Sequence, residues 1–243
     1  MSYDILKLSD DKIFRFSLDM LPTTEKDYNQ RRISPFIKGA FGLILTASID
    51  MLIGFSTSYW ATWEKIETRS YGGYGLWKMW SCSPKELGDG EYSRNTFTCS
   101  YKLAGWFEFP GWYVTTQVFS CIGFAGMLLT VFGLAMYICR VSLRTQRTIS
   151  VLITIGHCSG FSLLVSLAIF GFKVVSDIDA KKTTEWYLSW SFTLICTAFV
   201  LNEIAASVLA SEKHKILKDQ KDTQKLEEDM RNVLTKISSF QTK

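Results

Sequence analysis

The hydrophobic residues of this chain are concentrated in four segments that contain almost no charged residues. Polar and charged residues lie between these segments and at both ends of the chain. At roughly 1.5 Å per residue, the first segment extends about 33 Å as a helix, which is enough to cross the hydrocarbon core of a bilayer. The pattern therefore predicts a polytopic membrane protein. The predicted spans are 39–60, 113–138, 149–172 and 186–209.

Basic residues predict the orientation of the chain in the membrane. The loop after the second span carries Arg140, Arg144 and Arg147 and no acidic residue. Short loops rich in Lys and Arg stay on the cytosolic side, so both termini are expected in the cytosol. Two stretches then face the outside, a large loop at 61–111 and a short loop at 173–185.

The chain divides into a membrane domain, expected at 37–210, and two polar tails. The N-terminal tail, 1–36, is expected either to be mobile or to form a short amphipathic segment on the inner leaflet. The C-terminal tail, 211–243, is expected to be helical in part, because apolar residues recur in steps of four and three as in a coiled-coil seam. This stripe either packs on a partner or on the membrane face, or remains solvated. It consists of Leu226, Met230, Val233, Ile237 and Phe240.

The large loop is expected to fold as a small antiparallel β-sheet. It is rich in tryptophan and tyrosine, unlike disordered segments, and Gly72, Gly73 and Gly75 suit a tight turn between two extended segments. It also holds Cys82 and Cys99, whereas the other cysteines lie in or beside apolar segments. In an oxidising compartment a disulfide between these two is the default, worth about 3 kcal/mol in the chain-entropy model. Strands are expected near 62–69, 74–82 and 92–102.

A set of short motifs in and beside this loop has a recognisable order. The set consists of Trp60, Gly75, Leu76, Trp77, Cys82 and Cys99. It resembles the W…GLW…C…C signature of the claudin superfamily, which also includes the peripheral-myelin and epithelial membrane proteins and channel gamma subunits. Pro110-Gly111-Trp112 resembles the entry to that family's second span, and Trp186-Tyr187-Leu188 resembles the start of its fourth. The resemblance covers about residues 37–210.

The chain departs from the family pattern in four features: the spacing from Trp77 to Cys82, the longer spacing between the two cysteines, the long N-terminal tail and the C-terminal residues. Four residues separate Trp77 from Cys82, where the family usually has two. The C-terminal Gln241-Thr242-Lys243 lacks the apolar last residue that PDZ domains capture from many claudins. The last of these departures argues against binding of a scaffold protein through the last residues.

The resemblance implies an α-helical membrane protein, a left-handed bundle of four transmembrane helices with a small extracellular antiparallel β-sheet. In this family such sheets associate side by side in one membrane and head to head between cells. The implied function is a plasma-membrane protein of cell junctions that contributes to cell–cell adhesion or to a paracellular barrier. Its partners are then the lipid bilayer and itself or other claudin-like chains. The alternative is an auxiliary subunit of an ion channel or receptor. Acidic and basic residues are equally numerous in the large loop, which predicts no charge selectivity.

Three ionisable residues are predicted within the spans, Asp50, His157 and Glu203. An isolated intramembrane carboxylate is costly, so Asp50 is expected to face a partner or to be protonated. The depths of His157 and Glu203 allow a contact, and structural pairing is favoured over ion transport. Cys139, beside Arg140 at the inner membrane face, is either a lipid-facing small residue or a palmitoylation site. The sequence has no metal-ligand spacing, phosphate loop or nucleophile constellation, so no enzyme activity, cofactor or nucleic-acid partner is expected.

Overall fold

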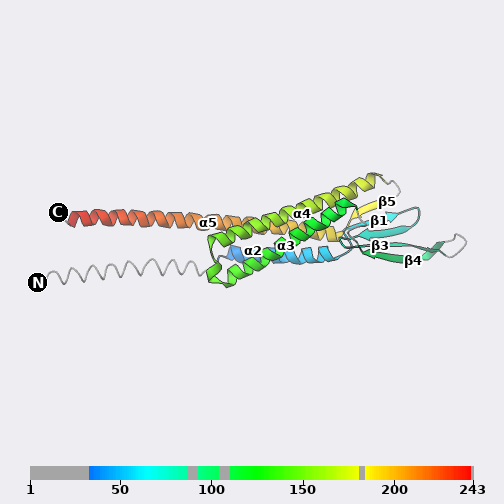
Figure 1. Cartoon of the computed structure of the whole chain (residues 1–243), viewed down its shortest axis with the longest axis horizontal. Coiled ribbons are helices and arrows are strands. Elements are labelled where there is room, and N and C mark those ends of the chain that lie inside the picture. Colours follow the sequence, from blue (N-terminus) through cyan, green and yellow to red (C-terminus); the bar gives the residue numbers. More distant parts are fainter. Residues whose placement is uncertain (1–32, 87–91, 104–109, 181–183, 242–243) are drawn as a thin grey trace.

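The computed structural model describes residues 33–86, 92–103, 110–180 and 184–241. The predicted mobile or amphipathic N-terminal tail lies almost entirely outside the described residues, as do the last two residues of the chain. Four long helices run side by side, and a small sheet lies at one end of them (Figure 1). The last helix continues far beyond the others at the end opposite the sheet.

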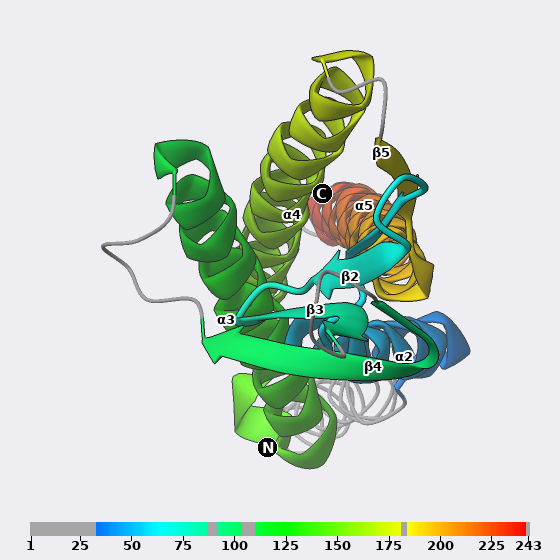
Figure 2. The same cartoon turned by 90° about the vertical axis from the view of Figure 1, so that its right-hand side faces the viewer.

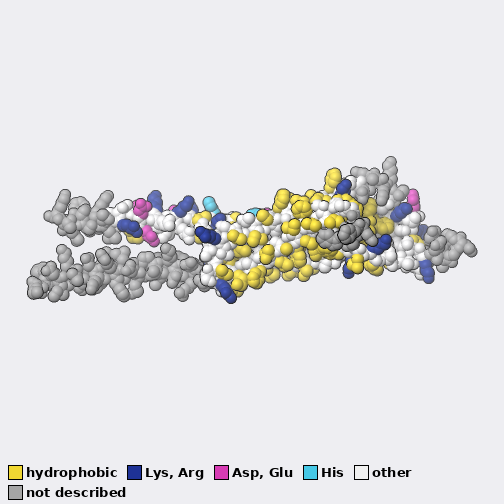
Figure 3. All heavy atoms as spheres, viewed as in Figure 1, with side chains coloured by type: hydrophobic (Ala, Val, Ile, Leu, Met, Phe, Trp, Pro, Cys, Tyr) yellow, Lys and Arg dark blue, Asp and Glu magenta, His cyan; other side chains and the backbone are white. Residues whose placement is uncertain are grey.

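Four helices are long and apolar enough to cross a membrane, as the hydrophobic pattern predicts. On the face seen in Figure 3, hydrophobic side chains cover the bundle and Lys and Arg side chains lie toward its two ends. The predicted fold class, a membrane bundle of four helices with a small antiparallel sheet, is thereby confirmed. The helices are α2 Pro35–Ser56, α3 Gly111–Cys139, α4 Gln146–Ala180 and α5 Trp190–Gln241, with a short 3-10 helix at Val141–Leu143.

The ends of three helices differ from the sequence-based prediction. α2 ends at Ser56, so Trp60 lies outside the helix. α4 continues to Ala180, through most of the predicted loop 173–185. α5 is one helix as far as Gln241, where the sequence predicts only partial helix. The length of an apolar segment matches the thickness of the hydrocarbon core and does not mark where the helix ends. A helix can extend beyond its apolar segment into water where no glycine or proline interrupts it.

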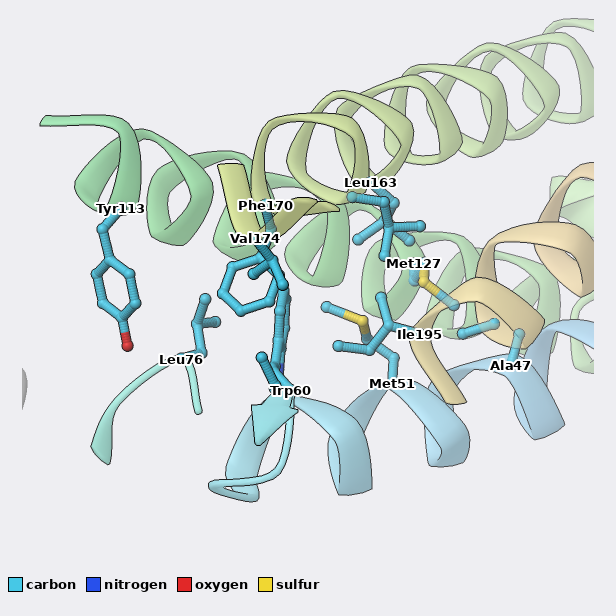
Figure 4. Close-up of a cluster of buried hydrophobic side chains, with 13 residues drawn as sticks. Ala47, Met51, Trp60, Leu76, Tyr113, Met127, Leu163, Phe170, Val174 and Ile195 are labelled. Carbon is cyan, nitrogen blue, oxygen red and sulfur yellow. The ribbon is translucent and has the colours of Figure 1, made fainter. Parts of the chain in front are cut away.

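Two clusters of buried hydrophobic residues hold the helices together. Between membrane helices, close contact depends on small residues and on hydroxyl groups. The hydroxyl groups of Ser120 and Ser166 lie 2.6 Å apart between α3 and α4. The cluster beneath the sheet includes Met51, Trp60, Leu163, Phe170 and Ile195 (Figure 4). The cluster toward the opposite end includes Ile37, Ile44, Leu134, Ile149 and Leu209.

The sheet has five antiparallel strands in the order β4-β3-β2-β1-β5 (Figure 2). Four strands come from the large loop, and the fifth comes from the short loop between α4 and α5. Because β5 pairs with β1, one sheet joins both loops. The strands are β1 Ala61–Lys65, β2 Ser70–Tyr74, β3 Lys78–Glu86, β4 Tyr92–Leu103 and β5 Thr184–Leu188.

Two of the predicted strands are misplaced, and the third, near 92–102, agrees with β4. The first predicted strand, 62–69, extends too far. The observed strand β1 stops at Lys65, and the chain then turns through Arg69, whose φ is 54°. The second predicted strand, 74–82, starts too early, because the observed strand β3 begins only at Lys78. β2 and β5 are additional strands that the sequence pattern does not predict.

The predicted role of the glycines is also wrong in part. Gly72 and Gly73 lie inside β2 and not in a turn. A Cβ atom on Gly72 would lie 2.5 Å from the carbonyl oxygen of Trp80 and 2.7 Å from the indole ring of Trp63. Glycine is therefore needed here because tryptophan side chains and a neighbouring strand pack directly on the β2 backbone.

Candidate functional site

Trp60 lies at the junction between the sheet and the helices. Its side chain is fully buried, and its indole N–H donates to the carbonyl oxygen of Gly54 near the end of α2 at 2.8 Å. Its ring meets the edge of Phe170 on α4, with ring centroids 5.1 Å apart (Figure 4). Its backbone N–H donates to Tyr74, and its carbonyl accepts from Ser189 before α5. Trp60 thus connects the sheet to three helices.

Gly75 follows β2 and crosses the segment that joins α2 to β1. A Cβ atom on Gly75 would overlap the backbone of Ser58 and Thr57, so no other residue fits without a shift of the chain. The N–H of Gly75 donates to the carbonyl of Lys78 at 2.8 Å, and its own carbonyl accepts from the hydroxyl of Tyr113 on α3. The glycine is required by the close approach of two backbone segments.

Leu76 and Trp77 lie between the sheet and the helices. Leu76 is fully buried, and its carbonyl accepts a hydrogen bond of 2.7 Å from the side-chain amide of Gln117 on α3. The ring of Trp77 meets the edge of Phe55 on α2 at a centroid distance of 5.2 Å, and Phe55 in turn contacts Phe124 on α3. The Gly-Leu-Trp segment therefore attaches the sheet to α2 and α3. The motif residues do not predict the hydrogen bonds that Tyr113 and Gln117 donate.

Cys82 on β3 is bonded to Cys99 on β4, which confirms the predicted disulfide. The two residues lie opposite each other in the strand register, with Cα atoms 4.1 Å apart. β4 is an edge strand whose neighbour in the sheet is β3. The disulfide therefore fastens the outermost strand to the rest of the sheet.

The edge strand β4 presents apolar side chains to solvent. Tyr101 is 76% exposed and Leu103 is 74% exposed, and Phe97 is exposed as well. Alternate residues of a strand share a face, so these three side chains form one row. An exposed apolar edge strand has unpaired backbone groups and readily pairs with another chain. This edge is the main candidate contact surface of the sheet.

β5 forms the opposite edge of the sheet. Tyr187 and Leu188 on this strand are exposed. The hydroxyl of Tyr187 donates to the carboxylate of Glu185, and this hydrogen bond raises the pKa of the Tyr187 phenol above its ordinary value. The phenol therefore stays neutral at physiological pH, and this edge too offers apolar and hydrogen-bonding groups.

The three ionisable residues of the spans form a pair and an isolated group. His157 Nδ1 on α4 lies 2.8 Å from Glu203 Oε2 on α5, with the side chains 44% and 31% exposed. Next to this pair, Asn202 is buried and donates from Nδ2 to the carbonyl of Gly156 at 2.9 Å. Asp50 on α2 is half-buried and joins neither contact. Within 33–86, 92–103, 110–180 and 184–241, no group bonds to Asp50.

Among the residues that the structure describes, the remaining reactive side chains do not gather in one place. The part of the chain that the structure describes contains no group of three His, Cys, Asp or Glu residues that could hold a metal ion. Cys139 is the last residue of α3 and is exposed. Its palmitoylation stays a prediction.

Gly160 on α4 is expected to be sensitive to substitution because it makes room for Glu203. A Cβ atom there would overlap Glu203 Oε1, so Gly160→Ala moves the carboxylate away from His157. We expect a loss of about 1–2 kcal/mol in the free energy of unfolding, measured by thermal unfolding in detergent. Gly156→Ala is the matched control, because its Cβ would lie 3.4 Å from Ala206, an ordinary contact.

The comparison should be repeated in a His157→Ala background. If the penalty of Gly160→Ala arises from the lost His157–Glu203 contact, it shrinks when His157 is already absent. An unchanged penalty, or equal effects of the two glycine variants, would contradict this account.

No protein-family model matches the chain, and no curated protein matches it. The claudin resemblance therefore rests on the motif residues. The structure brings these motif residues together. Trp60 and Gly75-Leu76-Trp77 are separated in sequence but meet at the junction of sheet and bundle, and the cysteine pair fastens the edge strand of the same sheet.

Proposed function

We propose that this protein is a claudin-like membrane protein of cell junctions that contributes to cell–cell adhesion or to a paracellular barrier through its sheet. The observation that carries the proposal is the attachment of the sheet. Buried Trp60 and Leu76 fix it to the bundle, and the Cys82–Cys99 bond fixes its edge strand. A sheet held in this way presents an ordered surface to a neighbouring chain at low entropic cost.

On this proposal the sheet lies outside the plasma membrane and both termini lie in the cytosol. The arginine-rich segment between α3 and α4 supports this orientation, because it lies at the end of the bundle opposite the sheet. Arg144 in this segment donates to the carbonyl of Ile138 at 2.8 Å, which covers one of the last carbonyl groups of α3.

The partners on this proposal are further copies of the chain or other claudin-like chains. The row of Phe97, Tyr101 and Leu103 on β4 supports lateral contact within one membrane, because an edge strand can add the strand of a neighbour. Exposed Ile66, in the turn between β1 and β2, supports contact at the tip of the sheet with a chain on the opposite cell.

The test is expression in cells that lack junctional strands, in a mixture with cells that do not express the protein. The measured quantity is the fluorescence at contacts between two expressing cells, divided by that at contacts between an expressing and a non-expressing cell. We expect a ratio clearly above one. Uniform labelling of the surface would contradict the proposal.

The double variant Tyr101→Glu with Leu103→Glu is expected to bring this ratio close to one. Both side chains are exposed, so their replacement should change the free energy of unfolding by only about 0.5 kcal/mol each. The matched control is Leu226→Glu, an exposed apolar residue on α5. It lies about 54 Å along the helix from Trp190, where α5 begins beside the sheet, at roughly 1.5 Å per residue. An equal decrease in both variants would argue against β4 as the contact surface.

A second candidate function is an auxiliary subunit of an ion channel or receptor. The observation that favours it is the carboxylate of Asp50, which lies inside a span and bonds to none of the described residues. Co-purification with a channel, without enrichment at cell contacts, would favour this candidate over adhesion.

A further inference from the structure

Asp50 places a carboxylate inside the span that α2 forms. It lies about 9 Å before Ser56, the last residue of the helix, at roughly 1.5 Å per residue. Lysine and arginine side chains are long enough to reach the membrane surface from such a depth, but the aspartate side chain is not. A charge in the hydrocarbon layer is costly unless another group pairs with it. A charged Asp50 therefore needs a partner inside the membrane.

The described part of the bundle supplies no such partner. No hydrogen bond or ion pair from a described residue reaches Asp50. The other two ionisable groups of the spans, His157 and Glu203, bond to each other at 2.8 Å. Lys38, the basic residue on α2, lies about 18 Å away along the helix axis.

Asp50 lies at the boundary between the buried and the exposed face of α2. Ala47 and Gly54, about one turn away, are buried. Ile49 and Ile53, which flank Asp50 in the other direction around the helix, are exposed. A helix that packs against α2 from the lipid can therefore reach Asp50.

Small residues continue the same exposed face from Asp50 toward the start of α2. Thr46, Gly42 and Gly39 follow at steps of four and three, so they share a face with Asp50, and all three are exposed. A Cβ atom on Gly39 or Gly42 would meet no atom within 4 Å. Small residues of this kind let the backbones of two membrane helices approach closely.

Glycines that face the bundle interior differ from these two. A Cβ atom on Gly54 would lie 2.6 Å from Ile195, and one on Gly123 would lie 2.6 Å from Leu163. Their space is already filled by a neighbouring helix of the same chain. Gly39 and Gly42 provide the same kind of space with none of the described helices of this chain in it.

We propose that the outer face of α2, formed by Gly39, Gly42, Thr46 and Asp50, binds a transmembrane helix of another protein that carries a Lys or Arg at the depth of Asp50. The small residues bring the two helices together, and the cation pairs with the carboxylate. The proposal goes beyond adhesion, because it concerns a lateral contact inside the membrane that is independent of any contact between cells.

The described helices of a second copy of this chain do not offer the required cation. In a two-fold pair of α2 helices, Asp50 would face Asp50, and like charges repel in the membrane. Lys and Arg residues of the described helices lie only toward the ends of the apolar stretches. They are Lys38, Arg147 and Lys173, and those from Lys213 onward.

The test uses the full-length protein with a fluorescent donor fused to its C-terminal end, reconstituted in phosphatidylcholine vesicles. The probe is a single-span helix of Leu and Ala that carries one Lys at the depth of Asp50 and an acceptor dye. One matched probe has Leu at that position, and another has the Lys two turns away. We expect the first probe to bind at least about tenfold more tightly than either control. A modest interaction free energy between the Lys of the probe and the carboxylate of Asp50 is enough for a tenfold change in affinity.

Variants of Asp50 assign the effect to the carboxylate. In Asp50→Leu the Lys probe is expected to bind no better than the Leu probe, and in Asp50→Asn it is expected to bind with intermediate affinity. Asp50→Lys should reverse the preference, so that a probe with Glu in place of Lys binds best. Thermal unfolding of each variant in detergent is expected to match that of the original protein, because no described residue bonds to Asp50.

Three outcomes would overturn the proposal. The first is equal energy transfer to the Lys and Leu probes. The second is energy transfer between labelled copies of the protein that disappears in Asp50→Asn, which would assign the face to a second copy. The third is a large loss of thermal stability in Asp50→Asn, which would place the partner of Asp50 inside the fold. None of these outcomes changes the enrichment at cell contacts, which tests adhesion separately.

Discussion

Serine in place of Cys82 or Cys99 is expected to keep the protein from reaching the cell surface. The bond joins β4 to β3, and β4 has no other neighbour in the described sheet. Its loss costs about 3 kcal/mol in the chain-entropy model. That is a large part of the stability of a small sheet, because whole domains have only about 5–15 kcal/mol. We expect the variant to be retained in the secretory pathway while its four helices still insert.

Cys158→Ser is the matched control, because Cys158 lies exposed on α4 and is a free cysteine. Surface biotinylation measures delivery, and protease protection of the loops measures insertion of the helices. We expect normal delivery for the control and a large decrease for both disulfide variants. Normal delivery of Cys82→Ser, together with enrichment at cell contacts, would show that the bond is dispensable and would remove the main support for the proposed sheet function.

The hydrophobic pattern is sufficient to predict the number of helices, because a charge-free stretch of this length has few alternatives to a membrane span. The pattern does not predict the full length of α5, whose polar half extends to Gln241. That half contains neither glycine nor proline, so helix propensity and not hydrophobicity determines where it ends.

The strands are harder to predict because their pairing is a long-range property. Thr184–Leu188 is short, and Trp186 and Tyr187 are typical of a membrane interface. The same residues form β5 because β1 is available beside them. Gly72 and Gly73 have the composition of a turn, yet they lie in a strand because tryptophan rings pack on them. The residue pattern of one segment does not determine which other segment will pair with it as a strand.

In the candidate site, too, the sequence predicts some features and not others. The motif residues are visible in the sequence, but their partners are not, since Gly54 and Ser58 act through backbone atoms. The sequence of α3 does contain a signal for the polar contacts of this helix. Buried polar residues recur there at steps of three and four on an otherwise apolar helix, which predicts a polar face that points into the bundle. These residues are Tyr113, Thr116, Gln117 and Ser120.

Trp60→Ala is expected to destabilise the protein at least as much as loss of the disulfide. The indole is fully buried and fills the space beneath the sheet, next to Phe170 and Phe192. Truncation of a buried tryptophan costs about 3–5 kcal/mol. Trp60→Phe keeps most of the ring contacts but removes the indole N–H that donates to the carbonyl of Gly54, which still accepts from the hydroxyl of Thr57 at 3.3 Å. The lost hydrogen bond and the smaller ring together cost about 1–3 kcal/mol.

Trp190→Ala serves as the control for these two variants. Trp190 is 49% exposed and stacks on Tyr59, so its loss should cost only about 1 kcal/mol. Thermal unfolding in detergent is expected to rank the variants with Trp60→Ala lowest, then Trp60→Phe, then Trp190→Ala. Because Trp60 lies beyond the end of α2 and beneath the sheet, Trp60→Ala should also make the sheet sensitive to protease while the helices remain inserted. A protease-resistant sheet in Trp60→Ala would mean that Leu76 and the hydrogen bonds to α3 hold the sheet without Trp60, and the junction would then depend on the Gly-Leu-Trp segment alone.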